Sequence, residues 1–427
     1  MFRTMKKVFK VDQLADRIKS QNNQKLLSKI FRKGLIKKFY HINTGHIVLN
    51  DGDDTFLFGN PEDNLKSEVS ILSREFYVLL GSGGVTGVAE AFMAGYWKTD
   101  NLLTLLQIVL KNKSVLLSLD STFAKFLKPI NKQIHRNRQN TIIGSKKNIT
   151  AHYDLNNDFY KLWLDPTMTY SCAFFHDKSI SLEEASVEKL DRICRKLKLT
   201  PGDSVLEIGT GWGSFAIHAA KNYGCKIITT TISDEQFDYA KKRITEEGID
   251  SQITLIKMDY RNLQGQFDKI VSIEMIEAVG YEFIPNFFSK VSSLLKPEGI
   301  MALQGITYND QNFDVYKNSV DFIKKYIFPG SCLISIAQIT NVIKNNTDLA
   351  MVDMEDITLH YAETLSRWRT NFLSVIPKVK ALGFSEAFIK MWEFYFTFCE
   401  AGFLERNIGD VQLIFAKSAA RNIDINY

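Results

Sequence analysis

The segment VLEIGTGWGS, residues 205–214, constrains the fold of this 427-residue chain more than any other feature. An apolar run ends at Glu207 and Ile208, glycines follow at alternate positions 209, 211 and 213, and an apolar-periodic segment covers residues 215–220. This order predicts a strand, a tight turn and a helix. Glycine tolerates positive φ and lets backbone N–H groups approach a ligand closely. The turn is therefore a candidate cofactor site.

The spacing of these glycines distinguishes between cofactors. A dinucleotide fold needs G-x-G-x-x-G, but the third glycine would fall at Ser214. It also needs an acidic residue after the second strand, where this chain has Thr231-Ile232-Ser233. Glu-x-Gly-x-Gly-x-Gly after a strand instead resembles the first motif of the S-adenosylmethionine-dependent methyltransferases. An ordinary glycine turn is the alternative.

Strands and helices are expected to alternate from about residue 151, which predicts a parallel α/β sheet. We expect residues 1–130 to form a smaller mixed α/β domain, residues 131–150 a polar linker, and residues 151–427 a Rossmann-like, seven-stranded catalytic domain. Six strand candidates can be placed in that last domain: 204–208, 226–230, 253–257, 269–273, 300–306 and 411–416. The aromatic-rich segment 307–334 is expected to be an insertion after the fifth strand.

The N-terminal region has weaker patterns. Residues 46–50 and 55–59 flank a turn-prone segment and predict a hairpin. Two apolar helices are expected at about 88–96 and 101–111, and the glycine-rich segment 81–87 is expected to separate the first of them from residues 76–80.

Positive charge is concentrated at the N-terminus. Residues 1–40 hold twelve Lys or Arg against two Asp, a balance of +10, although the whole chain carries only +5. Residues 24–40 place apolar and basic side chains at helical spacing, with Gly34 inside the pattern. A basic amphipathic helix suits an anionic membrane surface. A helix packed on its own domain with a solvated basic face is the alternative, and no nucleic-acid motif accompanies the charge, so we expect no nucleic-acid partner.

Cysteine usage and hydropathy indicate the compartment. The five cysteines are scattered singly without metal-ligand spacing, which favours a reducing cytoplasm and no metal site. No run reaches the roughly 18 uninterrupted apolar residues of a membrane span.

Several motifs together resemble the cyclopropane-fatty-acyl-phospholipid synthase family, which modifies cis double bonds in lipid chains. The resemblance covers about residues 80 to 420. Its motifs are HYDLNNDFY at 152–160, DPTMTYSCAFF at 165–175, TISDEQ at 231–236, DYR at 259–261, SIEMIEAVG at 272–280, KKYIFPG at 324–330, HYAETL at 360–365 and FCEAGF at 398–403. The resemblance implies a peripheral enzyme at the inner, cytoplasmic face of the membrane, a phospholipid substrate and an anionic membrane surface as partners, and it admits a homodimer.

The resemblance also implies a set of cofactor-binding residues. Glu207, Gly209, Gly211 and Gly213 would surround the methionine end of S-adenosylmethionine. The other residues implied for this cofactor are Thr231, Ile232 and Gln236 at the ribose, Asp259, Tyr260 and Arg261 at the adenine, and Tyr170 and Ser171 as a cover. For Tyr170 the alternative is a core aromatic.

The chemistry of the family requires a base. An alkene that attacks the sulfonium methyl becomes a carbocation, so the site must be apolar, dry and able to remove one proton. The resemblance implies a bound bicarbonate as that base. Its ligands would be Glu277, Tyr361 and the backbone at Cys172 and Ile306. For Glu277 the alternative is a solvated carboxylate at a helix start.

Two positions qualify the resemblance. The family commonly ends its fifth strand in His-x-Ile, whereas this chain has Gln304-Gly305-Ile306. Glutamine can hold an anion but cannot take up a proton, so a methyl-branched or methylenated product is an alternative to a ring. Cys399 matches a position known as a reactive cysteine, although a buried cysteine in an apolar helix usually serves packing. A small-molecule N-methyltransferase on the same scaffold is the other alternative.

Overall fold

The computed structural model describes residues 21–113 and 157–421, so the expected linker at 131–150 lies outside the described residues. The chain divides into two compact units. Within the described residues, the first contains 21–113 and 383–401, and the second contains 157–382 and 402–421. The second unit, which carries the glycine motif, is therefore interrupted in sequence by a segment of the first.

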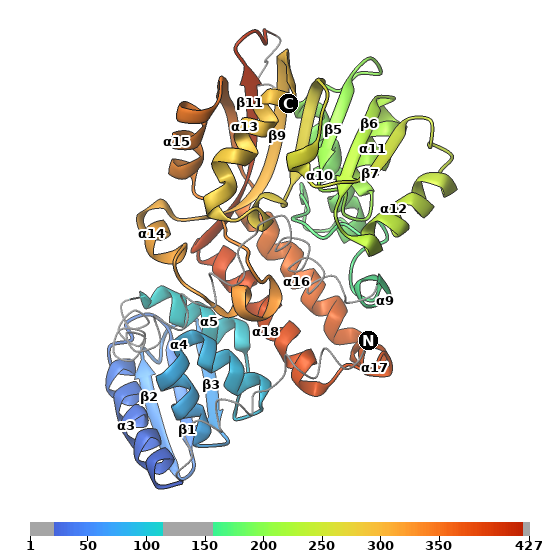
Figure 1. The fold of residues 1–427 in the computed structure, drawn as a ribbon. Coiled ribbons are helices and arrows are strands. Elements are labelled where there is room, and N and C mark those ends of the chain that lie inside the picture. Colours follow the sequence, from blue (N-terminus) through green and yellow to red (C-terminus); the bar gives the residue numbers. More distant parts are fainter. Residues whose placement is uncertain (1–20, 114–156, 422–427) are drawn as a thin grey trace. The chain divides into compact units, whose positions relative to one another are not determined.

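A seven-stranded sheet forms the centre of the second unit, in the order β10-β11-β9-β8-β5-β6-β7 (Figure 1). Neighbouring strands from β9 to β7 pair in parallel, whereas β11 pairs antiparallel with both β9 and β10. The strands are β5 (Ser204–Ile208), β6 (Lys226–Thr231), β7 (Ile253–Lys257), β8 (Phe267–Ile273), β9 (Leu295–Tyr308), β10 (Leu349–Asp356) and β11 (Ile408–Lys417). The predicted Rossmann-like sheet and its six predicted strands are confirmed, while β10 was missed.

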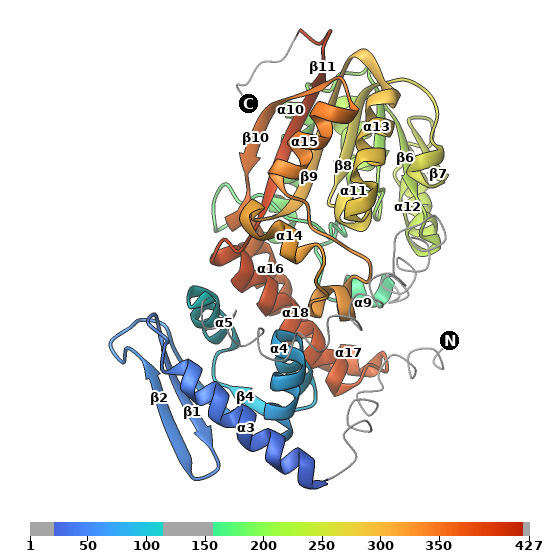
Figure 2. The same ribbon diagram turned by 60° about the vertical axis from the view of Figure 1, so that its left-hand side comes forward.

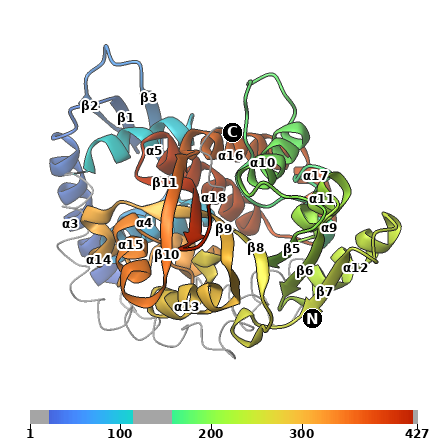
Figure 3. The same cartoon turned by 90° about the horizontal axis from the view of Figure 1, so that it is seen from above.

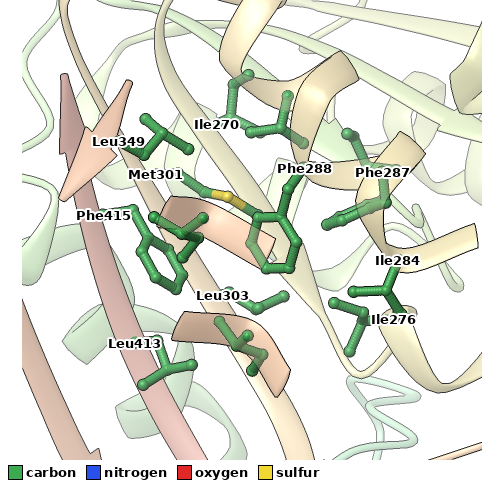
Figure 4. Packing of buried hydrophobic residues seen from close by; sticks show 14 of the residues in the cluster. Ile270, Ile276, Ile284, Phe287, Phe288, Met301, Leu303, Leu349, Leu413 and Phe415 are labelled. Carbon is green, nitrogen blue, oxygen red and sulfur yellow. The ribbon is translucent and has the colours of Figure 1, made fainter. Parts of the chain in front are cut away.

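Alternation along the strands gives the sheet two buried faces. On β9, Met301 and Leu303 point to one core and Ile300 and Ala302 to the other. The first core is closed by α13 (Ile284–Leu294) and α15 (Ile336–Asn346), and Figure 4 shows Phe287 and Phe288 of α13 packed over the sheet. The second core is closed by α10 (Leu182–Lys196), α11 (Ser214–Tyr223) and α12 (Asp234–Glu246). Figure 3 shows these two helical layers on opposite sides of the sheet.

The helices begin where the sequence supplies caps. Ser233 accepts a hydrogen bond from the Gln236 N–H and caps α12, as its sequence predicts, and Ser181 and Glu184 form a capping box at α10. The remaining helical segments of this unit are α9 (Asn157–Lys161), η1 (Tyr260–Asn262), η2 (Ile276–Ala278), η3 (Tyr281–Phe283), η4 (Asp310–Asn312), α14 (Phe313–Tyr316), η5 (Ile323–Ile327), α16 (Thr358–Ser374) and α17 (Ile376–Ala381). Three of these, η4, α14 and η5, lie in the expected insertion after β9.

The first unit contains a four-stranded sheet in the order β2-β1-β3-β4. Its strands are β1 (His46–Asp51), β2 (Asp54–Gly59), β3 (Lys66–Ile71) and β4 (Trp97–Thr99). The predicted β1–β2 hairpin is confirmed, and β3 pairs in parallel with β1. Helices α3 (Gln21–Phe39), α4 (Glu75–Met93), α5 (Leu102–Lys111) and the first part of α18 (Glu386–Leu404) complete the unit. The smaller mixed α/β unit thus agrees with the expected fold class.

The glycine-rich segment 81–87 separates two helical stretches, as expected, although the break lies at a single residue and the two stretches together form α4. Helix α4 runs through it with a kink at Gly84, whose φ is 55°. A Cβ on Gly81 would lie 2.3 Å from the ring of Phe31, so the glycine lets α3 pack closely on α4. Among the described residues α4 is the one helix long and apolar enough to cross a membrane, and half of its apolar window is buried within the protein.

Candidate functional site

The carboxyl ends of the parallel strands bring most of the predicted site residues to one edge of the sheet. After β5 the chain continues to β6 on one side, and β8 flanks β5 on the other. Ligands of open α/β sheets bind at such a switch point, beyond the carboxyl ends of the strands. The glycine turn follows β5, Thr231 ends β6, the 259–261 segment follows β7 and Glu274 follows β8. Figure 2 shows α14 and α16 at this same edge.

The glycine turn has the geometry that its sequence predicts. Gly209, Gly211 and Gly213 have φ values of 105°, 54° and 91°, and Gly213 caps α11. Only glycine adopts these angles readily. The N–H groups of Gly209 and Thr210 donate to the carbonyl of Thr230, which joins the turn to β6. A Cβ on Gly211 would meet no atom within 4 Å, so the turn leaves open space at that point.

Glu207 lies buried at the end of β5. Its Oε2 accepts a hydrogen bond from Thr229 Oγ1 at 2.5 Å, and Thr229 Oγ1 is also 2.6 Å from Thr210 Oγ1. Burial raises the pKa of the Glu207 carboxyl to about 8, against an ordinary value of 4.5. A cationic ligand group would favour its charged form. The carboxyl is thus suited to the ammonium of a bound methionine moiety.

The two segments after β6 and β7 are held by their own side chains. Thr231 Oγ1 donates to Oε1 of the buried Gln236 at 3.0 Å, and Ile232 is partly exposed beside it. Arg261 binds Asp259 with two side-chain nitrogens, at 2.8 and 2.6 Å. The ring of Tyr260 packs in the core against Phe287, with ring centres 5.4 Å apart.

Tyr170 lies in a cluster of aromatic rings. Its ring centre is 5.2 Å from Trp368, 5.5 Å from Trp163, 5.6 Å from Tyr160 and 6.2 Å from Phe328 of the insertion. The neighbouring Ser171 accepts a hydrogen bond at 2.8 Å from the ammonium of Lys189, which is fully buried. The segment 170–172 therefore meets the aromatic insertion on one side and a buried cation on the other.

Glu274 is the residue that the sequence analysis passed over. It follows β8 with a φ of 48°, an angle that residues other than glycine rarely adopt. Its Oε1 accepts from the Cys172 N–H and from Gln304 Nε2, both at 2.8 Å, and its Oε2 accepts from the Tyr361 hydroxyl at 2.6 Å. Three groups predicted to hold an external anion thus hold this carboxylate.

Glu277 lies one turn further along the chain and is also buried. Its Oε1 accepts from the Ile306 N–H at 2.5 Å, whereas its buried Oε2 has no hydrogen-bond partner. Burial first, and then the neighbouring Glu274, raise the pKa of Glu277 to about 8. The alternative of a solvated carboxylate is therefore wrong.

Further polar groups lie behind Glu274. The amide of Gln304 also approaches Oδ2 of the fully buried Asp410 at 3.4 Å and accepts from Gln412 at 3.1 Å. Burial and the Glu274 charge raise the pKa of Asp410 well above its ordinary value. Burial likewise raises the pKa of the Cys172 thiol, so Cys172 contributes its backbone N–H and not a thiolate.

A bicarbonate does not fit where the sequence placed it. The donors expected to bind it are the N–H groups of Cys172 and Ile306, the amide of Gln304 and the hydroxyl of Tyr361. All four already bind the carboxylates of Glu274 and Glu277. An added anion would face two carboxylates and lose these donors, which is unfavourable at a buried site.

Of the site residues that were not predicted, one had a sequence feature that could have identified it. Glu274 is a charged residue directly after a buried strand at the ligand-binding edge, and this could have singled it out. Asp410 and Lys189 had no such signal, because strand pairing and helix packing bring them to the site. Cys399 lies on the part of α18 that belongs to the first unit and is partly buried, and its predicted reactivity stays a prediction.

Comparisons with known proteins show the family. A family model described as mycolic acid cyclopropane synthetase matches residues 141–413. Tuberculostearic acid methyltransferase UfaA1 of Mycobacterium tuberculosis is 36% identical over 332 residues, which cover 76% of this chain and 77% of that protein. Cyclopropane-fatty-acyl-phospholipid synthase of Escherichia coli is 34% identical over 375 residues, covering 84% and 90%.

Solved structures of cyclopropane synthases also match this chain. The cyclopropane synthase MmaA2 of Mycobacterium tuberculosis matches with a TM-score of 0.60 and 29% identity, over 64% of this chain and 98% of that one. The mycolic acid cyclopropane synthase CmaA1, complexed with SAH and CTAB, matches with a TM-score of 0.60 and 30% identity over the same shares. Coclaurine N-methyltransferase, with 17% identity and a TM-score of 0.58, shares the fold alone.

Proposed function

This chain belongs to the mycolic acid cyclopropane synthetase family of S-adenosylmethionine-dependent methyltransferases, and we propose that it modifies the unsaturated acyl chains of membrane phospholipids. In the proposed reaction a methylene unit is added across a cis double bond to give a cyclopropane ring. The observation that carries this proposal is the pairing, at one edge of the sheet, of a cofactor turn with buried carboxyls beside an aromatic cluster.

The cofactor supplies an electrophilic methyl group when bound. Glu207 would hold its ammonium, the glycine turn its methionine backbone, Gln236 its ribose, and Asp259 with its neighbours the adenine side. Tyr170 and Ser171 would cover it. Two features support these assignments: the open space at Gly211 leaves room for a ligand, and the buried carboxyl of Glu207 suits a cationic one.

The aromatic side chains would exclude water and tolerate positive charge. Aromatic faces attract cations, and a dry site prevents a carbocation from being captured by water. Tyr308 at the end of β9 stacks on Tyr316 of the insertion, with ring centres 4.1 Å apart, and the buried Lys324 ammonium lies 3.8 Å from the centre of the Tyr316 ring. We assign this insertion to covering the acyl chain.

The first unit would bring the enzyme to its substrate. Lys25, Lys29, Lys33 and Lys37 are exposed on α3 and recur every four residues, so they share one face of the helix. Leu26 and Ile30 are exposed at 59% and 51% on the same helix. A basic face with exposed apolar side chains suits the anionic surface of a membrane, which supports a peripheral enzyme at the cytoplasmic face.

The test is the product. Purified protein, S-adenosylmethionine and vesicles of a monounsaturated phospholipid should yield S-adenosylhomocysteine and a lipid heavier by one CH₂ group. Nuclear magnetic resonance should show ring protons in that lipid. An exocyclic methylene at the same mass would assign the methylenating activity instead. An unmodified lipid would refute the proposal.

A further inference from the structure

We propose that the carboxylate of Glu274 is the catalytic base of this enzyme and takes the place of a bound external anion. The proposal rests on the proposed function, because a base is needed only if an alkene is alkylated. It is carried by the convergence of three donors from different elements on one carboxylate: Cys172, Gln304 of β9 and Tyr361 of α16.

The backbone at Glu274 supports a specific role. A residue other than glycine at a φ of 48° costs about 1 to 2 kcal/mol relative to an ordinary angle. The N–H of Glu274 donates to the carbonyl of Gln304 at 2.9 Å, which fixes this conformation against β9. Such strain is retained at functional sites when the surrounding structure holds it in place.

Glu274 is the best placed of the three neighbouring acids to be the charged one. Its two oxygens receive three hydrogen bonds, whereas Glu277 receives one on its side chain and leaves Oε2 without a partner. Asp410 has the long contact of 3.4 Å with Gln304 and an interaction with the weakly donating Cys172 thiol, and it leaves Oδ1 without a partner. Hydrogen bonds to a carboxylate favour its charged form. Of the three acids, Glu274 is therefore the one on which a negative charge is best stabilised.

The surroundings of Glu274 act on its pKa in opposite directions. Burial raises the pKa of Glu274 above 4.5, while Tyr361, the Cys172 N–H and the buried Lys189 ammonium oppose that shift. A base is most effective when its pKa lies near the working pH. All three carboxyls are deeply buried, so the three hydrogen bonds that it accepts, and not exposure, distinguish Glu274 from Glu277 and Asp410.

The proposed step balances in atoms and charge. The alkene attacks the sulfonium methyl carbon, so a C–C bond forms, the S–C bond breaks and the other alkene carbon becomes cationic. Glu274 then takes a proton from the added methyl group, and the electron pair of that C–H bond closes the ring onto the cationic carbon. The products are S-adenosylhomocysteine, the ring and a protonated Glu274, which returns its proton to water.

Two substitutions distinguish Glu274 as the base from a bound external anion as the base. Glu274→Gln keeps the side-chain shape and should lower turnover at least about 100-fold, the scale of general base catalysis. Glu274→Gly suits the positive φ and frees the Cys172, Gln304 and Tyr361 donors. It should be equally slow, but added formate or bicarbonate should restore activity to it and not to Glu274→Gln. The control Glu282→Gln, an exposed acid eight residues on, should match the wild type.

The wild-type enzyme provides an independent measurement. Its turnover should be unchanged in buffer freed of carbon dioxide and bicarbonate. Cofactor affinity, measured by calorimetry, should be retained in both Glu274 variants and shows that they are folded. A wild-type rate that falls without bicarbonate, or a Glu274→Gln rate close to wild type, would overturn the proposal. If the wild type modifies no lipid at all, the proposed function fails instead.

Discussion

Gly211 and Glu274 both have a positive φ angle, but only at Gly211 does the absence of a side chain leave open space. At Gly211, with φ of 54°, the missing side chain leaves space that the cofactor is expected to fill. We predict that Gly211→Val leaves the protein folded and removes detectable S-adenosylmethionine binding in calorimetry, because the new side chain enters that space. The backbone strain alone should cost roughly 1 to 2 kcal/mol of stability.

Gly248 offers the matched control for that strain. It has a φ of 68°, nothing lies within 4 Å of its added Cβ, and it follows α12 at the opposite edge of the sheet. Gly248→Val should destabilise the protein by a similar amount and keep its cofactor affinity. Equal binding by the two variants would show that the glycine turn is not the cofactor site.

The Tyr361 hydroxyl gives a prediction about pH. It donates to Glu274 Oε2 at 2.6 Å and so stabilises the charged form of the proposed base. Turnover should fall as the pH drops below the pKa of that base, because the protonated acid cannot accept a proton. A hydrogen bond to a charged group is worth about 1.5–3 kcal/mol. Tyr361→Phe should therefore move the acidic limb of the pH–rate profile upward by roughly one to two pH units.

Tyr223→Phe is the comparison for this measurement, since the Tyr223 hydroxyl donates to Asp191 at 2.8 Å on the helical layer of α10 and α11. Its profile should match the wild type. If Tyr361→Phe lowered the rate equally at every pH, Tyr361 would act by packing and not by holding the charge.

At the scale of elements, the features that depend on residues close in sequence were predicted from the sequence. The Ser233 cap, the hairpin of β1 and β2 and six strands of the seven-stranded sheet were all predictable from residues close in sequence. β10 was missed because Asp353, Glu355 and Asp356 interrupt its apolar residues, and because as an edge strand it leaves apolar side chains exposed and lacks the apolar run of the inner strands. The break in α4 was expected from its glycines, whereas the close packing of Phe31 on Gly81 was not, because it is a tertiary contact.

Helix α3 carries the prediction about membranes. Lys29 and Lys33 are exposed, whereas Arg32 between them is paired with Asp51 and Asp54 of the hairpin at 2.5 and 2.6 Å. Each basic residue near an anionic surface contributes about 1 kcal/mol. Changing both lysines to Gln should therefore weaken sedimentation with phosphatidylserine vesicles about thirtyfold at low salt, and less at high salt.

The same change of charge on another element tests whether the position matters. Lys66 of β3 and Lys98 of β4 are exposed in the same unit. Changing both to Gln should leave vesicle binding nearly intact. If the two double variants lost the same affinity, only the net charge of the unit would matter, and α3 would be a scaffold helix.

At the scale of the whole molecule, the family and the sheet could be predicted from sequence, but the identity of the proposed base could not. The motifs fix which segments reach the carboxyl edge of the sheet, and this is a property of topology. Which acid accepts hydrogen bonds from the anion-binding donors depends on a single side chain. The family pattern pointed to Glu277, whereas the structure has Glu274 in that place. The pairing of β9 with β11 then brings Asp410 and Gln412 behind it from a distant part of the chain.

Buried acids at this edge should make the stability of the fold depend on pH. The pKa values of Glu207 and Glu277 are both raised to about 8 by burial, above their ordinary value of 4.5. The stability associated with such groups is fully present below the lower value and is lost as the pH rises through the higher one. We predict that the melting temperature of the free protein falls between about pH 5 and pH 9. Glu207→Gln should make this fall smaller, and the exposed Glu235→Gln of α12 should leave it unchanged.

Binding of S-adenosylmethionine should offset part of this loss of stability at higher pH. S-adenosylmethionine carries an ammonium that favours the charged form of Glu207, so its binding lowers the pKa of that carboxyl and releases a proton near neutral pH. Its affinity should therefore rise with pH up to about 8, and calorimetry in buffers of different ionisation enthalpy should detect the released proton. Glu207→Gln should bind more weakly and release none. Binding by the wild type with no proton release would mean that Glu207 does not meet the cofactor cation, and that its burial serves the fold alone.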